Sequence, residues 1–266
     1  MVCNLSEILS PAGIEAIHNT SMRLLAETGV QFPNEEAISV FNQHGCKVDG
    51  CTVYLSEDQV LKAVNDAPAQ FTIHARNPDR SVTVGNGEPV FVPAYGAPFL
   101  ADPVVGKRTP TLTDYHNLAR LAHALPNQDL SGHLMVEVDD EMATGSYLNM
   151  IYANIIHSDK PFMGSMAGVL GASRTLEIAR ILFGEPLDER PVTIGLADSL
   201  SPLRYSGEII GALLEYARAK QPLIIAALIM AGATGPITLA GVLAPVSYTH
   251  LRAHETSLPI SYAVVC

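Results

Sequence analysis

The sequence predicts an α/β fold: a (β/α)8 TIM-type barrel truncated after about five strands, with an N-terminal helical and β-hairpin cap. Three observations predict it. Residues 222–244 read as a buried strand, a tight turn and the start of a helix. Strand-like and helix-like segments alternate from residue 89 onward. Each strand–helix unit is about 30 residues long, which is typical of parallel strands joined by crossover helices.

The stretch 222–244 shows the strand–turn–helix pattern most clearly. Apolar residues run almost unbroken through 223–229, as expected for a strand covered on both faces in a parallel sheet. Small residues at 231–235 indicate a narrow turn. Pro236 suits the first position of a helix, because proline lacks the N–H that would be unsatisfied there.

The same rhythm organises the segment 89–244, a partial barrel. Strands are expected at 90–94, 130–136, 161–165, 192–197 and 223–228, and helices at 112–124, 141–156, 173–183 and 205–219. Parallel strands with right-handed crossovers fit a doubly wound sheet as well as a barrel. No G-x-G-x-x-G or G-x-x-x-x-G-K-[ST] motif opens a helix, which favours the barrel over a nucleotide-binding sheet.

Residues 1–88 predict a separate cap of helices and hairpins. Helix starts are indicated by Ser10 followed by proline, by Asn34, and by Ser56 with Gln59 in a capping box. These helices are expected to end near residues 28, 44 and 66. Hairpins are expected at 46–55 and 71–84, where apolar and polar residues alternate around turn residues.

Composition excludes several classes of protein. The 266 residues carry a net charge of −11, which argues against a nucleic-acid partner. No apolar run is long enough to span a membrane and no signal peptide is evident, so a cytoplasmic location is expected. Four cysteines are too few for a disulfide scaffold, and two incidental thiols at Cys46 and Cys51 are favoured over a redox or metal pair.

The last 22 residues, 245–266, follow no strand–helix rhythm. His250, His254 and Glu255 have a spacing that could suit zinc ligands on a helix. The segment instead resembles translated adapter read-through at the end of an environmental reading frame. It is therefore expected to be a non-native tail without a metal site.

Active sites of barrels form at the carboxyl ends of the strands. The residues at those ends are Tyr95, Glu137, Asp139, Ser165, Met166, Asp198, Ser199, Ser201, Met230 and Thr234. Each also has a structural interpretation: Glu137 can complement a helix dipole, Asp198 can cap a helix, and Tyr95 can simply pack. No Ser–His–Asp or Cys–His arrangement is evident, so the catalytic residues stay unassigned.

Six segments carry a resemblance to a known family. They are 74–78 (HARNP), 102–114 (DPVVGKRTPTLTD), 125–127 (LPN), 160–162 (KPF), 200–203 (LSPL) and 231–241 (AGATGPITLAG). In order and spacing, over roughly residues 5–244, the chain resembles the trimethylamine methyltransferase family, which includes glycine betaine–corrinoid methyltransferases that lack pyrrolysine. Full-length members are considerably longer, so the resemblance implies that this chain is an N-terminal fragment, inactive by itself.

The resemblance implies transfer of a methyl group from a methylated amine to the Co(I) of a separate corrinoid protein. No cofactor would be bound directly, because the corrinoid is carried by the partner and its cobalt is the nucleophile. A quaternary amine such as glycine betaine is favoured over trimethylamine, and the full-length protein is expected to be a homo-oligomer. From their positions, we expect the substrate-binding residues to be Tyr95, Glu137, Asp198, Ser201 and Thr234.

Two other interpretations stay open. One is a different barrel enzyme, a lyase or aldolase, which a lysine or metal cluster in the missing strands would favour. The other is a non-catalytic module that binds a betaine without turning it over.

Overall fold

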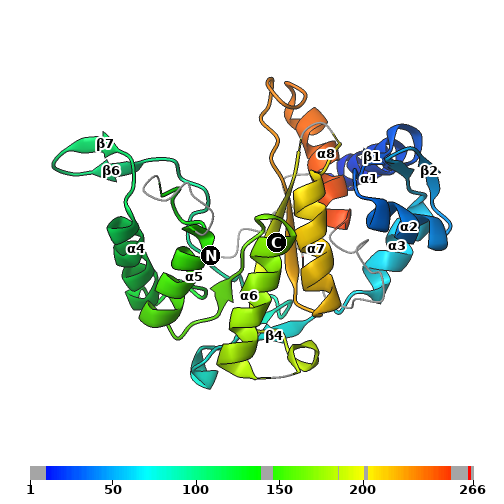
Figure 1. Cartoon of the computed structure of the whole chain (residues 1–266). Coiled ribbons are helices and arrows are strands. Elements are labelled where there is room, and N and C mark those ends of the chain that lie inside the picture. Colours follow the sequence, from blue (N-terminus) through cyan, green and yellow to red (C-terminus); the bar gives the residue numbers. More distant parts are fainter. Residues whose placement is uncertain (1–9, 139–145, 185, 201–202, 253–262, 265–266) are drawn as a thin grey trace. The chain divides into compact units, whose positions relative to one another are not determined.

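The computed structural model describes residues 10–138, 146–184, 186–200, 203–252 and 263–264 (Figure 1). The chain divides into two compact units. The cap unit comprises Met1–Ala67, Ala197–Ile210 and Ile224–Cys266, and the sheet unit comprises Pro68–Leu196 and Gly211–Leu223.

The first helix of the cap unit begins where the sequence predicts. In α1 (Pro11–Arg23), the Ser10 side chain accepts a hydrogen bond from the N–H of Gly13. The helix continues as a π-helical turn, η2 (Leu24–Thr28), and ends at Gly29 with φ of 72°. A Cβ at Gly29 would lie 2.8 Å from the carbonyl oxygen of Val53, so only glycine fits this close approach to the neighbouring strand.

The other two helices and the first hairpin of the cap unit also confirm the prediction. Asn34 caps α2 (Glu35–Gln43), and Ser56 with Gln59 forms the capping box of α3 (Glu57–Asp66). Between them lies an antiparallel sheet in the order β1–β3–β2, formed by Val30–Gln31, Thr52–Tyr54 and Lys47–Asp49.

A distant part of the chain joins this small sheet. The N–H of Gln31 donates to the carbonyl of Leu203 (2.9 Å), and the N–H of Tyr205 donates to the carbonyl of Gln31 (3.1 Å). The rings of Phe32 and Tyr205 stack with centroids 5.5 Å apart. The segment that follows β9 is therefore part of the cap unit's core.

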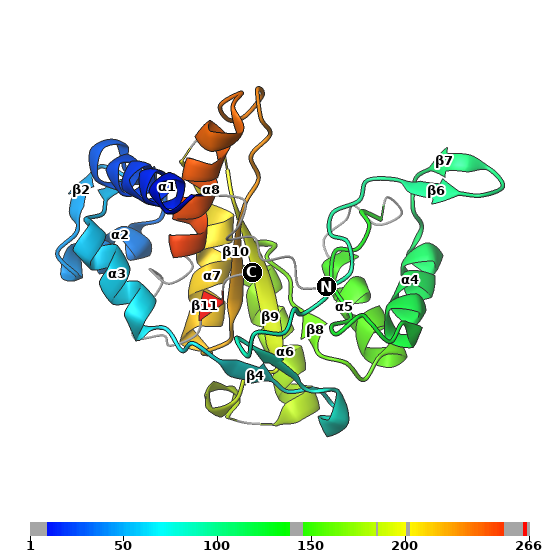
Figure 2. The same ribbon diagram turned by 180° about the vertical axis from the view of Figure 1, so that it is seen from behind.

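The helix expected at Pro236 begins three residues later. In α8 (Leu239–Arg252), the Thr238 hydroxyl accepts from the N–H of Gly241, so Thr238 acts as the N-cap and Pro236 lies in the preceding turn. The helix passes residue 244 and contains Pro245. It packs along α1, as Figures 1 and 2 both show, and the buried Ser21 hydroxyl donates to the carbonyl of Ala244 (2.9 Å).

The sheet unit opens with two hairpins. The expected one pairs β4 (Phe71–Ile73) with β5 (Val82–Val84) around a 3-10 turn, η3 (Pro78–Arg80). The second, β6 (Leu100–Asp102) with β7 (Gly106–Arg108), lies in a stretch for which no strand was predicted.

Three of the five expected barrel strands are present, as β8 (Phe162–Met163), β9 (Thr193–Ser199) and β10 (Leu223–Ala227). The prediction of strands at 90–94 and 130–136 was wrong: these segments are irregular, and near them only an isolated parallel bridge, Ala97 to Val136, is formed. The physical reasons lie in the chain itself. Pro93 has no N–H for a ladder, and Gly132 adopts a φ of 74°, outside the β region.

Backbone hydrogen bonds nevertheless place the five segments side by side in chain order. The N–H of Asp129 donates to Phe91, that of Ser131 to Pro161, and that of Gly164 to Ile194, each at 2.9 Å. The N–H of Gly195 donates to Pro222 at 3.2 Å. β8 and β9 are parallel. The neighbour order expected for consecutive strand–helix units is thus present, although two of its strands are not regular.

Four helices follow these segments: α4 (Leu112–Ala124), α5 (Ser146–His157), α6 (Gly168–Phe183) and α7 (Gly207–Arg218). α6 begins five residues before its expected start, and residues 141–145 of the expected α5 lie outside the described part. α4 and α5 pack together over a core that includes Tyr115, Ala119, Met135, Val136 and Met150. No helix in the described residues is long and apolar enough to cross a membrane.

Candidate functional site

Tyr95 and Glu137 lie on neighbouring segments of the sheet unit. The N–H of Gly96, next to Tyr95, donates to the carbonyl of Leu134 (2.6 Å). The N–H of Glu137 donates to the carbonyl of Ala97 (3.0 Å). Tyr95 is half-buried and Glu137 is exposed. The two predicted residues therefore flank the one bridge that joins the first and second strand-like segments of the described chain.

Tyr95 also lies near two buried tyrosines from helices, Tyr115 of α4 and Tyr216 of α7. Burial raises the pKa of both phenols, and the proximity of Tyr95 raises each further. The Tyr216 hydroxyl donates to the carbonyl of Ser165 (3.0 Å), at the end of β8. The phenol of Tyr95 is therefore close enough to those of Tyr115 and Tyr216 to act on both electrostatically.

Beside them is a buried polar group that sequence reasoning missed. The Tyr115 hydroxyl donates to the carbonyl of His133 and accepts from the Asn154 amide (2.7 Å). His133 is 4% exposed, and neither ring nitrogen has a hydrogen-bond partner among the described residues. Burial lowers the pKa of His133 to about 4, so the imidazole is neutral at pH 7. The sequence did contain a signal for this group, because His133 is a polar residue within the apolar stretch 130–136 that was expected to be a strand.

Asp198 lies in the cap unit, near the end of β9. The side chain is half-buried and makes no hydrogen bond or ion pair within the described chain. Burial raises the pKa of this carboxyl. It does not cap α7, whose first residue is Gly207: the Ser206 hydroxyl accepts from the N–H of Ile209 instead.

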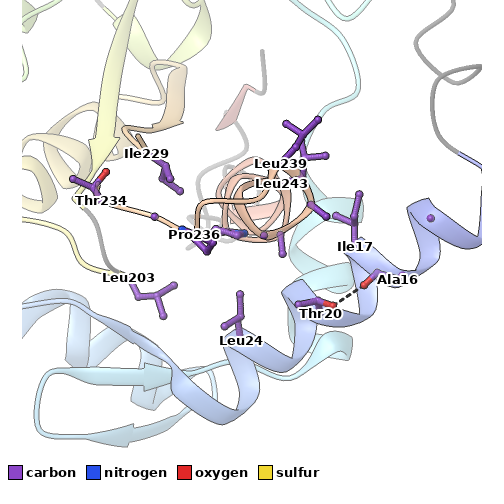
Figure 3. A pocket seen from close by; sticks show the side chains of 16 residues that line it. Ala16, Ile17, Thr20, Leu24, Leu203, Ile229, Thr234, Pro236, Leu239 and Leu243 are labelled. Atoms are coloured by element: carbon purple, nitrogen blue, oxygen red, sulfur yellow. Dashed lines mark hydrogen bonds between the residues drawn. The ribbon is translucent and has the colours of Figure 1, made fainter. Parts of the chain in front are cut away.

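Thr234 lines a cavity of about 840 Å³ in the cap unit (Figure 3). The walls come from α1, α8, Leu203 and the turn before α8, and none of the lining residues is charged. The Thr234 hydroxyl accepts from the N–H of Met230 (2.9 Å), and the Thr20 hydroxyl donates to Ala16 (2.7 Å). Because its two hydroxyls serve the chain's own backbone, this cavity offers a cation only apolar walls.

The remaining candidate residues are buried, exposed or outside the described part of the chain. Ser165 and Ser199 are buried, Met166 is 7% exposed, and Met230 is 56% exposed. Ser165 accepts from the N–H of Ala167 and is thereby part of a turn. Ser201 and Asp139 lie outside the described residues, as do His254 and Glu255 of the expected tail.

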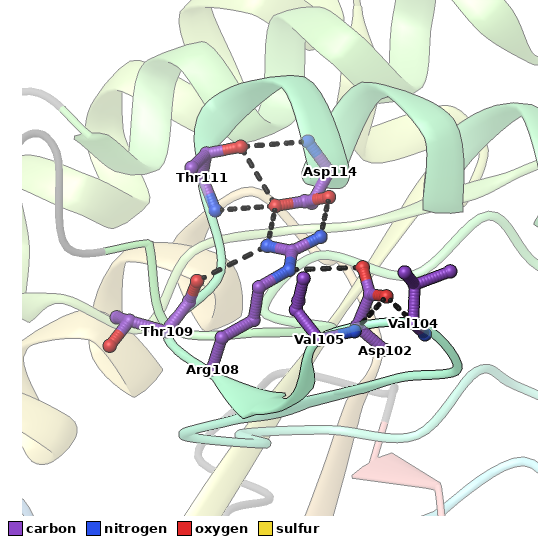
Figure 4. A network of polar contacts seen from close by, with 7 residues as sticks. All are labelled: Asp102, Val104, Val105, Arg108, Thr109, Thr111 and Asp114. Atoms are coloured by element: carbon purple, nitrogen blue, oxygen red, sulfur yellow. Dashed lines mark hydrogen bonds and ion pairs between the residues drawn. The ribbon is translucent and has the colours of Figure 1, made fainter.

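The segment 102–114 forms the polar network in Figure 4. Arg108 donates to both carboxylate oxygens of Asp114 (2.6 and 2.8 Å) and to Asp102 (3.2 Å). Asp114 also accepts from the N–H and hydroxyl of Thr111, which completes the capping box of α4. This segment anchors the β6–β7 hairpin to a helix start, a structural task.

Two further segments of the resemblance, 74–78 and 160–162, each supply a cationic side chain that binds carbonyl groups at the end of a helix. Arg76 donates to the carbonyls of Ile155 and Ser158 at the end of α5. Lys160 donates to the carbonyls of Ala122 (2.7 Å) and Leu125 (2.8 Å) at the end of α4. Cations at helix carboxyl ends are stabilised by the exposed carbonyls and the helix dipole. No group of three His, Cys, Asp or Glu side chains in the described residues could hold a metal ion.

The chain is similar in sequence to several methyltransferases. It is 45% identical over 238 residues to glycine betaine methyltransferase of Desulfitobacterium hafniense (strain Y51), covering 89% of this chain and 50% of that protein. It is 30% identical over 245 residues to proline betaine:corrinoid methyltransferase of Eubacterium limosum, covering 88% and 50%. It is 28% identical to trimethylamine methyltransferase of D. hafniense (strain DSM 10664 / DCB-2), covering 86% and 47%. The chain thus spans about half the length of these relatives.

Two solved structures share its fold. A hydroxylamine complex of MtmB matches with a TM-score of 0.58 at 13% identity, covering 94% of this chain and 54% of that one. The Methanosarcina barkeri monomethylamine methyltransferase matches with a TM-score of 0.52 at 12% identity, covering 91% and 55%. The model of the trimethylamine methyltransferase (MTTB) family matches residues 2–253, nearly the whole sequence. This chain belongs to the trimethylamine methyltransferase family.

Proposed function

We propose that the complete protein transfers a methyl group from a quaternary amine, glycine betaine or a close analogue, to the Co(I) of a corrinoid protein. The observation that carries this proposal is the 45% identity to a glycine betaine methyltransferase, well above the 28% to a trimethylamine methyltransferase. The alternative of a lyase or aldolase is not favoured by any of these relatives.

The proposed reaction needs little acid–base chemistry from the protein. Co(I) donates an electron pair to the methyl carbon, the C–N bond breaks, and its electrons leave with a neutral tertiary amine. No proton has to move. The protein's tasks are to bind the cation, to align the methyl group with cobalt and to exclude water. A neutral His133 and buried phenols, none of them a strong nucleophile at neutral pH, are compatible with such a site.

We propose Tyr95, Glu137, Asp198, Ser201 and Thr234 as substrate-binding residues of the complete protein; of these, Tyr95 and Glu137 lie in the sheet unit, and Asp198 and Thr234 in the cap unit. An aromatic face contributes about 0.5 to 2 kcal/mol to binding of a cation. Tyr95 supports this role because it lies near two other phenols, and Asp198 supports it because its half-buried carboxylate has no partner in the described chain.

We further propose that the fold is a (β/α)8 barrel of which this chain supplies about five strand–helix units (89–244), preceded by an N-terminal segment of helices and hairpins (1–88) whose last 21 residues the structure groups with the sheet unit. Residues 245–266 are proposed to be non-native, and the polypeptide alone to be inactive. The chain-order pairing of five segments supports the barrel. We place the protein in the cytoplasm with its corrinoid partner, because Co(I) must be kept reduced.

A substrate panel tests the proposal. The complete protein encoded at the source locus is mixed with cob(I)alamin and, in turn, glycine betaine, proline betaine and trimethylamine, and loss of the Co(I) absorbance is followed. Turnover with glycine betaine and none with trimethylamine is expected. Tight binding of glycine betaine without turnover would identify a non-catalytic binding module, and turnover with trimethylamine alone would contradict the substrate class.

A further inference from the structure

The second strand-like segment of the sheet unit, 130–136, is not a regular strand. Within the described chain it forms an isolated bridge, Ala97 to Val136, in place of a continuous ladder. A ladder holds a strand through evenly repeated backbone hydrogen bonds, so a segment without one depends more on the side chains around it. The segment nevertheless leads directly into Glu137 and pairs with the stretch that follows Tyr95. What holds it therefore also holds these two residues.

One buried hydroxyl ties this segment to two helices. The Tyr115 side chain of α4 is fully buried, and its hydroxyl donates to the carbonyl of His133. The same hydroxyl accepts from the amide nitrogen of Asn154 on α5 (2.7 Å). Asn154 is also buried, and its amide nitrogen donates to the carbonyl of Met150 (3.0 Å), which orients it. Because α4 and α5 pack side by side, the hydroxyl joins both helices and the segment 130–136 at a single atom (Figure 1).

The connection continues from His133 to the stretch of Tyr95. The N–H of Gly96 donates to the carbonyl of Leu134 (2.6 Å). Leu134 directly follows His133, so neighbouring carbonyls of one segment are bound by the Tyr115 hydroxyl and by the residue next to Tyr95. A shift of the first carbonyl moves the second, because the peptide unit between them is planar and stiff.

Burial makes this connection hard to replace. All of these residues belong to the sheet unit, and Tyr115 shares a buried cluster with Met135, Val136 and Met150. If the hydroxyl were removed, the His133 carbonyl would lose its donor in a place where water does not readily substitute for it. Tyr115 is thus a fixed point for the segment.

We propose that Tyr115 is a positioning residue of the substrate site, which sets the places of Tyr95 and Glu137 through the His133 carbonyl. This inference rests on the proposed function, in which Tyr95 and Glu137 bind the methylated amine. Because Tyr115 is fully buried, it acts through these residues and does not touch the substrate. Small displacements at such a site are costly, since a misplacement of about 1 Å can lower a rate about 100-fold.

The kinetic test is Tyr115→Phe in the complete protein encoded at the source locus, with cob(I)alamin and glycine betaine. The variant keeps the ring and removes only the hydroxyl. We expect kcat to fall and KM to rise, so that kcat/KM drops about tenfold or more. An unchanged kcat/KM would overturn the proposal.

Thr193→Val is the matched control. The Thr193 hydroxyl is also buried in the sheet unit and donates to a backbone carbonyl, that of Phe162 on β8 (3.0 Å). The control should therefore lower the melting temperature about as much as Tyr115→Phe and leave kcat/KM unchanged. Equal losses of kcat/KM in the two variants would mean that Tyr115 has only a structural role.

A double variant separates positioning from a general loss of stability. In the background Tyr95→Leu/Glu137→Gln, the residues that Tyr115 positions no longer bind the substrate. Tyr115→Phe should then lower kcat/KM by less than about twofold further. The full effect of Tyr115→Phe in this background would contradict the proposal.

Amide hydrogen exchange tests the connection without any turnover. Tyr115→Phe should speed exchange of the backbone N–H groups of Gly96 and Glu137 by about fivefold or more, and Thr193→Val should not. Unchanged exchange would overturn the proposal whatever the substrate is. If wild type does not demethylate glycine betaine but exchange responds as expected, the proposed substrate fails and Tyr115 still positions the two segments.

Discussion

The guanidinium of Arg108 holds the carboxylate of Asp114 through two hydrogen bonds of 2.6 and 2.8 Å. The same carboxylate accepts from the N–H of Thr111 and so caps α4. One side chain therefore joins the β6–β7 hairpin to the helix that supplies Tyr115. Of the segments that carry the family resemblance, 102–114 is the longest, and its role in this chain is to fix local geometry.

This pair predicts a pH dependence of stability. Arg108 is the main cause that holds the pKa of Asp114 below its usual range. A carboxyl whose pKa is lower in the folded state contributes stability above the unfolded pKa, near 4, and loses it as the pH falls toward the folded pKa. Asp114→Asn should therefore destabilise the protein fully at pH 7 and progressively less below about pH 4.

The check is urea denaturation of wild type and Asp114→Asn between pH 3 and 7. Glu177→Gln is the control, because Glu177 forms an exposed ion pair with Arg174 on the surface of α6 and should cost little at any pH. The ion pair would not be the source of this stability if the difference in unfolding free energy between wild type and Asp114→Asn stayed constant down to the lowest pH.

A second prediction concerns Gly164 and Tyr216. A Cβ at Gly164 would lie 2.0 Å from the Tyr216 hydroxyl oxygen and 2.7 Å from a methyl group of Thr175, both of them buried. Gly164→Ala should therefore cost about 3 kcal/mol or more in unfolding free energy. Tyr216→Phe alone loses the hydrogen bond to Ser165 and should cost about 1 kcal/mol.

The double-mutant cycle distinguishes the clash from a general effect of the methyl group. Removing the hydroxyl relieves the contact, so Tyr216→Phe should cost less, or even stabilise, in the Gly164→Ala background. Simple additivity of the two free energies would show that the hydroxyl and the new methyl group do not meet.

Gln221 provides a third prediction. Its fully buried amide accepts from the N–H groups of Val192 and Thr193 (2.8 and 3.4 Å) and donates to the carbonyls of Leu187, Arg190 and Ala219 (2.9, 3.3 and 3.0 Å). Gln221→Leu leaves these backbone groups buried without a partner and should cost about 3 to 5 kcal/mol.

Gln221→Glu should be nearly as harmful, because a carboxylate oxygen would then face carbonyl oxygens where the amide donated. Gln43→Leu, at an exposed position on α2, is the control and should stay within about 0.5 kcal/mol of wild type. If Gln221→Leu and Gln221→Glu unfold at the same denaturant concentration as Gln43→Leu, the hydrogen bonds of the Gln221 amide do not stabilise the fold as the structure indicates.

The fourth prediction separates stability from binding at Asp198. Because burial raises its pKa, the ionised carboxylate opposes folding, and that cost appears as the pH rises through the folded pKa. Asp198→Asn should thus raise the melting temperature at neutral pH. If the carboxylate binds the cation, the same variant should raise KM for the betaine by about tenfold or more.

The pH profile completes this test. In wild type, KM should rise on acidification at a pH above that of an ordinary carboxyl group, whereas KM of Asp198→Asn should not change over the same range. An unchanged KM in the variant would remove Asp198 from the site.

How much the sequence could predict depended on how local each signal is. Ser10, Asn34 and Ser56 cap helices through contacts within three residues, and all three helix starts are confirmed. The start of α8 was predicted wrongly, because Pro236 was taken as the first helical residue, whereas that residue is Leu239 and Thr238 is its N-cap. The strands at 90–94 and 130–136 failed because Pro93 and the positive φ of Gly132 interrupt a pattern that is apolar enough for a sheet.

The site depended on contacts that sequence spacing does not reveal. Placing candidates at strand ends put Tyr95 and Glu137 on segments that the structure shows to be neighbours, although their roles stay predictions. The bond from Tyr115 to the His133 carbonyl joins a helix to a strand-like segment and has no local signature. The partnerless state of Asp198 within the described chain likewise emerges only from the folded surroundings.

The most direct test of the proposed reaction follows the methyl group itself. Glycine betaine labelled with carbon-13 in its N-methyl groups is incubated with the complete protein and its corrinoid partner reduced to Co(I), and the products are read by NMR. The proposal predicts labelled methyl–cobalt and dimethylglycine in equal amounts. Dimethylglycine without labelled methyl–cobalt, or no conversion of the betaine at all, would contradict it.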